Sequence, residues 1–257
     1  WKFGTITSGA VMVPCPWFPS VAQLCRENPE IDTGVHATLN AEWEAYRWSP
    51  LSTRDQASGL LDADGYFHQW HQAVYDNAGP EAVEAEVNAQ IERALAAGID
   101  VTHVDSHMGT IMSPLFIHSY IQAAGSRKLP SMLPHLGAKG MDMAGLSDTE
   151  RKAYEPIEQM LVESGVPMLE GLLSMPLDEP DGQMETAKAL LGNLPVGITH
   201  FVPHPSIDTA EVRAIAPDWE SRVANYNTFM SDELKKFIEG QDIKLIGYRQ
   251  IRDAMRN

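Results

Sequence analysis

The sequence predicts an α/β fold, a single domain over residues 1–257 in which strands alternate with helices around a parallel sheet or barrel. Short apolar runs recur along the chain, and amphipathic stretches stand between them. No repeat or Ser/Gly-rich linker marks a domain boundary. In such folds the carboxyl ends of the strands carry the chemistry, so these ends are where functional residues are sought.

Three short apolar runs in the first half of the chain are expected to be strands. The first run covers residues 6–13 and the second covers residues 31–39. Pro14 and Pro16 close the first run, because proline punctuates regular structure. The third expected strand covers residues 99–104.

The clearest helix is expected over residues 81–97. Pro80 precedes it and Gly98 follows it, and these are the residue types that helix starts and ends prefer. Branched side chains recur every fourth residue and should bury one face of the helix against the strand that begins at Ile99. These side chains are Val83, Val87, Ile91 and Leu95.

The second half of the chain continues the alternation. Ser147 and Glu150 form a capping box, which opens a helix that Gly165 would stop. Pro156 inside this helix predicts a kink or two shorter pieces. Further helices are expected over 183–191 and 231–239, strands over 197–202 and 243–248, and a short helix at the C-terminus.

The charge balance limits the ligands that this chain can bind. Nineteen basic and 35 acidic residues give a net charge of −16. Such a chain repels phosphate backbones, so no nucleic-acid partner is expected, and a neutral or cationic small substrate fits best. No apolar run approaches the roughly 18 residues of a membrane span, so no membrane partner is expected and a cytoplasmic location is predicted. Cys15 and Cys25 are expected to be reduced thiols.

Three of the nine histidines stand where predicted strands finish, namely His36, His107 and His204. Strand alternation would place Asp105 on the same side as His107, together with His103. Imidazole nitrogen suits Zn²⁺, Co²⁺, Ni²⁺ or Mn²⁺, and a carboxylate commonly completes an open catalytic site. The pattern indicates a metal site, and a hydrogen-bonded structural histidine is the alternative for each residue.

Other residues are candidates for substrate contact. His135 lies in a segment that is expected at the mouth of the site, and Glu42 follows the second predicted strand. Four tryptophans are candidates for lining a sugar groove, although tryptophan is more often a core residue. They are Trp17, Trp43, Trp48 and Trp70.

At these residues the chain resembles the YdjC/ChbG-type carbohydrate deacetylases, relatives of the metal-dependent polysaccharide deacetylases. The resemblance spans nearly the whole chain, and its segments appear in the family's order. They are ITSGAVMVPCPW (6–17), GVHATLNAEW (34–43), THVDSHMGT (102–110), THFVPHP (199–205) and IKLIGYRQI (243–251). The resemblance implies a distorted (β/α) barrel that removes an acetyl group from an N-acetylated sugar or oligosaccharide.

Carried over by position, the resemblance implies that His36 and His107 are ligands of a divalent metal ion, Mg²⁺ or Zn²⁺. It implies that His204 is the general acid and that Asp105 orients a neighbour or contacts the substrate. Relatives often carry an arginine near Met132, so this methionine is expected to bear on substrate specificity.

The family begins with a strand that carries an Asp-Asp pair, of which one member is a metal ligand and the other is the general base. No such pair is present in this sequence, and Asp32, Asp62 and Asp64 lie in other contexts. Because residue 1 is Trp1 rather than methionine, the family's first strand–helix unit is expected to lie upstream. The alternative is a degenerate relative.

Two other functions stay open at this point. One is a phosphoesterase or another amidohydrolase on the same barrel, since fold does not fix function. The acidity of the chain disfavours a phosphorylated substrate. The other is a sugar-binding protein that has lost catalysis, against which stands the presence of both His36 and His107. A homo-oligomer also stays open.

Overall fold

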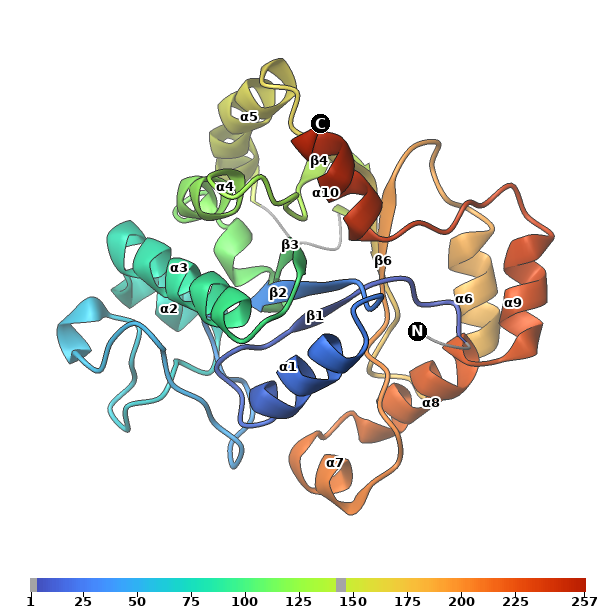
Figure 1. Cartoon of the computed structure of the whole chain (residues 1–257), viewed down its shortest axis with the longest axis horizontal. Coiled ribbons are helices and arrows are strands. Elements are labelled where there is room, and N and C mark those ends of the chain that lie inside the picture. The colour runs from blue at the N-terminus through green and yellow to red at the C-terminus, as the bar shows by residue number, and fades with distance from the viewer. Residues whose placement is uncertain (1–3, 142–146) are drawn as a thin grey trace. The chain divides into compact units, whose positions relative to one another are not determined.

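The computed structural model describes residues 4–141 and 147–257, and it confirms the mixed α/β class with parallel strands (Figure 1). The chain divides into two compact units. The β1–β3 unit comprises Ser8–Met132 and Gly247–Asn257, whereas the β4–β6 unit comprises the residues up to Thr7 and Leu133–Ile246. In the described ranges the strands pair as two sheets of three, so the barrel and the single domain stay predictions.

The β1–β3 unit is built on a parallel sheet with β2 at its centre. Its strands are β1 (Gly9–Val11), β2 (Thr33–Ala37) and β3 (Val101–Ser106). Every residue of β3 is buried, as expected for a parallel strand covered on both faces. The helices of this unit are α1 (Phe18–Glu27), α2 (His71–Asn77), α3 (Pro80–Ala96), α4 (Ile117–Gly125) and α10 (Tyr248–Arg256), with 3₁₀ turns η1 (Gln56–Ser58) and η2 (His107–Met112).

Helix α3 confirms the predicted helix but corrects its buried face. Val83, Val87 and Ile91 are fully buried, whereas Leu95 is 41% exposed. A spacing of four residues advances slightly more than one turn of 3.6 residues, so the row drifts around the helix by about 40° at each step. After three steps Leu95 has left the face that packs on the sheet.

The strand predicted over 243–248 is wrong, because helix α10 begins at Tyr248 and residues 243–247 pair with no strand in the described ranges. A short apolar run is buried whether it forms a strand or an irregular segment, so the apolar pattern alone cannot distinguish these two conformations. The ring of Tyr248 stacks on His103 with a centroid distance of 3.9 Å. Helix α10 is thereby packed against β3.

The β4–β6 unit holds the second parallel sheet. Ser147 and Glu150 form the predicted capping box of α5. The helix continues through the exposed Pro156, so the two-piece alternative is wrong, and water can solvate the carbonyl that proline leaves unpaired. The elements are β4 (Pro134–Lys139), α5 (Asp148–Glu163), β5 (Leu169–Ser174), α6 (Gln183–Leu191), β6 (Thr199–Val202), α7 (Ala210–Ile215), α8 (Trp219–Phe229) and α9 (Asp232–Glu239).

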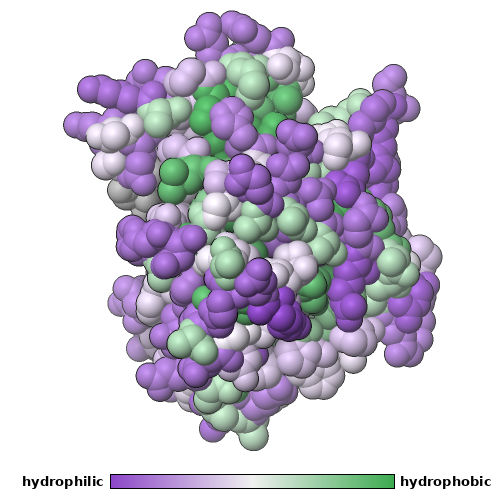
Figure 2. Space-filling model, turned by 90° about the vertical axis from the view of Figure 1, so that its left-hand side faces the viewer, coloured by the Kyte–Doolittle hydropathy of each residue, from purple (hydrophilic) through white to green (hydrophobic). Residues whose placement is uncertain are grey.

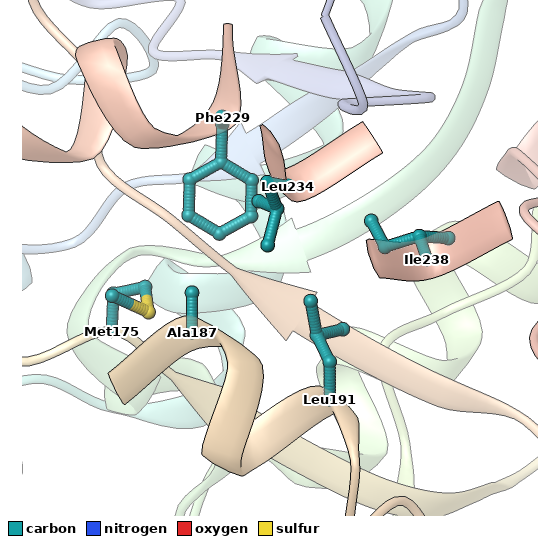
Figure 3. Close-up of a cluster of buried hydrophobic side chains, with 6 residues drawn as sticks. All are labelled: Met175, Ala187, Leu191, Phe229, Leu234 and Ile238. Atoms are coloured by element: carbon teal, nitrogen blue, oxygen red, sulfur yellow. The ribbon is translucent and has the colours of Figure 1, made fainter. Parts of the chain in front are cut away.

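The core of the β4–β6 unit lies where α6, α8 and α9 converge (Figure 3). Six buried side chains pack there, five from these helices and one from the residue that follows β5. They are Met175, Ala187, Leu191, Phe229, Leu234 and Ile238.

The face drawn in Figure 2 is largely polar, and both cysteines are free thiols. Polar residues cover much of the face drawn in Figure 2, with hydrophobic residues gathered in smaller patches between them. Neither cysteine is in a disulfide; Cys25 is buried and Cys15 is half-buried. None of the helices in the described ranges is long and apolar enough to cross a bilayer.

Candidate functional site

The first histidine of the predicted metal site forms a pair across two strands. His36 of β2 lies opposite Asp105 of β3 in the parallel register. Its Nδ1 is 2.7 Å from Oδ1 of Asp105. Burial opposes the charged imidazole, but the charge and hydrogen bond of Asp105, with the charge of Glu42, raise the pKa of His36 above its ordinary value. When Nδ1 donates its proton to Asp105, Nε2 is left as the atom that can bind a metal.

The second histidine stands just after β3. His107 Nε2 is 2.8 Å from Oε2 of Glu42, which lies in the loop after β2. Burial lowers the pKa of His107, and the hydrogen bond that its imidazole donates to Glu42 only partly opposes this effect. The backbone beyond His107 reverses sharply, with φ of 53° at Met108 and 71° at Gly109. A non-glycine residue in this left-handed region is uncommon, and it marks a constrained turn.

The two imidazoles lie edge to face, with ring centroids 5.2 Å apart and an interplanar angle of 70°. Each ring has one nitrogen on a carboxylate. The other nitrogens, Nε2 of His36 and Nδ1 of His107, have no hydrogen-bond partner among the described residues. Two imidazoles held by outer carboxylates fit the chemistry of a divalent metal site. In the part of the chain that the structure describes, no group of three or more His, Cys, Asp or Glu side chains is arranged to hold a metal ion, so the metal-binding role of His36 and His107 stays a prediction.

Two buried polar residues of α3 support this site, and sequence reasoning missed them. Gln90 accepts from the backbone N–H of Thr38 at 3.0 Å and donates to its carbonyl at 2.7 Å, two residues beyond His36. Glu86 in turn accepts from Gln90 at 2.8 Å. Both side chains are fully buried. The sequence signal that could have revealed them is a pair of polar residues, four positions apart, among the apolar residues of the predicted helix.

Asn40 is a third support that the sequence did not reveal. Its Oδ1 accepts from the Thr110 hydroxyl at 2.8 Å, and its Nδ2 lies 2.9 Å from Sδ of Met108. The side chain therefore ties the loop after β2 to the turn after His107. Asn40 is fully buried, so these hydrogen bonds are made out of water, where leaving them unmade is costly.

His103 is a buried packing residue and not part of the histidine pair. It is 1% exposed, and its ring lies between Tyr248 and the backbone of Gly34. A Cβ on Gly34 would lie 2.5 Å from the His103 ring, so glycine makes room for this histidine. Thr102 Oγ1 lies 3.0 Å from its Nδ1.

The remaining predicted site residues are placed as follows. Met132 is 6% exposed and donates its backbone N–H to the Val104 carbonyl at 3.1 Å. His135, in the β4–β6 unit, has Nδ1 2.7 Å from Oε1 of Glu158.

His204, also in the β4–β6 unit, stands two residues after β6 and donates its backbone N–H to Oδ1 of Asn225 at 3.0 Å. Asn225 is fully buried and donates to Gln183, so the segment that carries His204 is fixed within its own unit. The roles of His204, His135 and Met132 stay predictions.

Comparison with known proteins gives a consistent result. Residues 1–240 match the family described as YdjC-like protein. The chain is 31% identical to a protein of Thermus thermophilus named carbohydrate deacetylase, over 97% of this chain and 86% of that protein. It is 25% identical to a carbohydrate deacetylase of Thermoanaerobacter pseudethanolicus, over 96% and 89% of the two chains.

A solved structure from Enterococcus faecalis V583, whose name proposes cellobiose-phosphate cleavage, has a similar fold. The TM-score is 0.77, the sequence identity is 22%, and the match covers 97% of this chain and 89% of that one.

Proposed function

This chain belongs to the YdjC-like protein family, and from that premise we propose that it is a carbohydrate deacetylase, a hydrolase that cleaves the amide bond of an N-acetylated sugar. The observation that carries the proposal is the pair of strand-end imidazoles, His36 and His107, each held by a carboxylate. The names of the two bacterial relatives support the same reaction.

We propose that His36 and His107 hold a divalent metal ion through the nitrogens that the carboxylates leave available. Such an ion would polarise the amide carbonyl and make a water more acidic. Asp105 keeps the His36 ring in one orientation and tautomer, and Glu42 does the same for His107. Glu42 is thus proposed as an orienting residue beside its predicted contact with substrate. Zn²⁺ and Mg²⁺ are the proposed ions, and imidazole ligands favour Zn²⁺.

His204 is proposed as the general acid, on the resemblance of the THFVPHP segment. Cleavage of the amide bond leaves an amine nitrogen on the sugar, and this nitrogen must gain a proton as it departs. A positioned imidazolium supplies that proton and accelerates such steps by about 10²- to 10⁴-fold. The hydrogen bond from the His204 backbone to Asn225 supports the role by fixing the segment.

The test is metal content and acetate release, measured on the same protein samples. We expect the wild type to release acetate from N-acetylglucosamine or its short oligomers and to release no phosphate from phosphorylated sugars. His36→Ala and His107→Ala should lose both metal and activity, whereas His204→Asn should keep the metal and lose activity.

His118→Ala is the matched control, because His118 is an exposed histidine of α4 in the same unit as His36. It should keep both metal and activity. Metal content and activity that survive in His36→Ala would show that the site is assigned to the wrong residues.

A further inference from the structure

A cluster of aromatic rings continues from the histidine pair into the loop after β2. We call it the aromatic cluster, and it consists of Trp43, Tyr46 and Trp48. Its rings are in mutual contact, with centroids 5.9–6.2 Å apart. The ring of Trp48 also lies 6.1 Å from that of His107. Ring contacts therefore lead from the proposed metal ligand through Trp48 to Trp43.

The aromatic cluster has a fixed base and an accessible part. Trp48 is 3% exposed, and its Nε1 donates to the Asn40 carbonyl at 3.0 Å. Arg47 anchors the loop between the rings, because its guanidinium donates to the Asp62 carboxylate at 2.7 Å and to a backbone carbonyl. Trp43 and Tyr46 are only half-buried. Two large rings thus stay partly in contact with solvent on a loop that hydrogen bonds hold in place.

Acidic groups surround this surface. Glu42 precedes Trp43 and bonds His107, and the exposed Glu44 follows it. Aromatic faces beside carboxylates suit a ligand that is apolar on its flat face and neutral or cationic elsewhere. An N-acetylated pyranose is neutral, and the amine that deacetylation leaves on it is cationic. A phosphorylated sugar would meet like charge here.

We propose that Trp43, with Tyr46 beside it, is the surface on which a sugar ring of the substrate stacks, and that Trp48 is its rigid support. The inference rests on the proposed deacetylase function. The C–H face of a pyranose is flat and apolar, and it can replace water against an aromatic ring at little entropic cost because the rings are already ordered. Trp43 would then set affinity for the sugar without taking part in the bond cleavage.

The experiment compares Trp43→Ala, Trp43→Phe, Tyr46→Ala and the control Trp70→Ala in the full chain. Trp70 is also a sequence candidate for the sugar groove, but it is 56% exposed, and its ring contacts none of the three rings of the aromatic cluster in the described part of the chain. The proposal therefore leaves Trp70 outside the sugar-binding surface, and it serves as the control. With N-acetylglucosamine and its dimer, Trp43→Ala should raise KM by about tenfold with kcat nearly unchanged, because a stack binds ground and transition states alike. Trp43→Phe should stay within about threefold of wild type, and Trp70→Ala should match it.

Binding of glucosamine, observed as saturation transfer from protein to sugar by NMR, gives a second readout without turnover. Wild type and Trp70→Ala should bind, and Trp43→Ala should not. If Trp43→Ala kept the KM and binding of Trp70→Ala while acetate release continued, the stacking proposal would be overturned and the deacetylase function would stand. If the wild type bound glucosamine through Trp43 but released no acetate, the stacking surface would stand and the function would fail. Should circular dichroism show that Trp43→Ala is unfolded, the decision passes to Tyr46→Ala, where an unchanged KM would refute the proposal.

Discussion

At the scale of single residues, the contact between Gly34 and His103 leaves no room for a side chain at position 34. Gly34→Ala would place its methyl group 2.5 Å from the His103 ring, which is itself held against Tyr248. Overpacking of this kind typically costs about 1–3 kcal/mol. We expect a loss of that size in the free energy of unfolding in urea.

Gly9→Ala is the matched control for that measurement. Gly9 lies on the neighbouring strand β1, is exposed, and has no atom within 4 Å of the position that a Cβ would take. This variant should be neutral or stabilised by less than about 1 kcal/mol, since alanine restricts the unfolded chain. Equal stability of the two variants would show that the His103 ring moves aside at no cost.

Contacts between residues at the ends of neighbouring strands can be predicted from the sequence, whereas contacts made by loop residues cannot. His36 and Asp105 meet because parallel strands in register bring their carboxyl ends together, and that rule needs only the strand pattern. The hydrogen bond from His107 to Glu42 depends on the path of a loop, and the hydrogen bonds of Asn40 and Gln90 depend on it too. No periodicity encodes such a path, so those contacts emerge only in three dimensions.

At the scale of elements, α3 offers a test of which face packs on the sheet. Val87→Asp would bury a carboxylate at a fully buried position, and we expect it to lose more than about 3 kcal/mol of stability. Leu95→Asp, on the same helix but 41% exposed, should change stability by no more than about 0.5 kcal/mol. Urea unfolding followed by circular dichroism at 222 nm measures both. Similar losses in the two variants would show that Leu95 lies on the buried face together with Val87.

Helix α10 is tied to the start of β3 by an ion-pair cluster. Arg252 is buried and donates to Asp100 at 2.6 Å, and Arg249 bonds the same carboxylate. Asp100→Asn removes the negative charge that pairs with Arg252 and Arg249. The Asp100 side chain is 52% exposed, so water screens these pairs and a loss of about 1 kcal/mol is expected at pH 7. Asp253→Asn is the control, because Asp253 is similarly exposed, at 55%, but pairs with Arg252 alone, and this variant should lose less.

The same ion pair predicts how stability depends on pH. Partial burial raises the pKa of Asp100, but the hydrogen bonds and charges of Arg252 and Arg249 outweigh it and bring the pKa below its ordinary value. The stabilisation is therefore complete above the unfolded-state pKa of about 3.9 and is lost as pH falls through the lower folded-state pKa. The difference between wild type and Asp100→Asn should be constant from pH 7 to about 5 and shrink below about 4. A difference that instead grew in acid would refute the assignment.

Element prediction succeeds where local signals, such as helix ends and periodic apolar residues, decide the conformation. Helix α3 combines suitable ends with periodic apolar residues, and α9 begins at a capping serine, Ser231. Residues 243–248 fail because their apolar pattern reports burial and does not report whether a neighbouring strand is available. Strands β4 and β5 were not predicted either, since each depends on a partner that is distant in the sequence.

At the scale of the whole molecule, the net charge of −16 predicts a response to salt. Like charges repel one another more in the compact state than in the unfolded chain, and salt screens that repulsion. Raising NaCl from about 10 to about 150 mM at pH 7.5 should raise Tm by about 2–4 °C, which corresponds to about 1 kcal/mol. Near pH 5, close to the isoelectric point of 4.9, the same step should have little effect. A Tm that falls with salt at pH 7.5 would show that attractive pairs dominate.

The bond between Asp100 and Arg252 joins residues that are 152 positions apart in the chain. On the ribosome, β1, β2 and β3 emerge long before α10, and Leu133–Ile246 must be translated in between. At about 5–20 residues per second this interval is on the order of ten seconds. During this interval, the His103 ring has no Tyr248 ring to stack on, and α10 does not yet cover β3 of the sheet that carries His36. The nascent chain therefore offers chaperones, and competing nascent chains, an apolar surface that the finished protein no longer has.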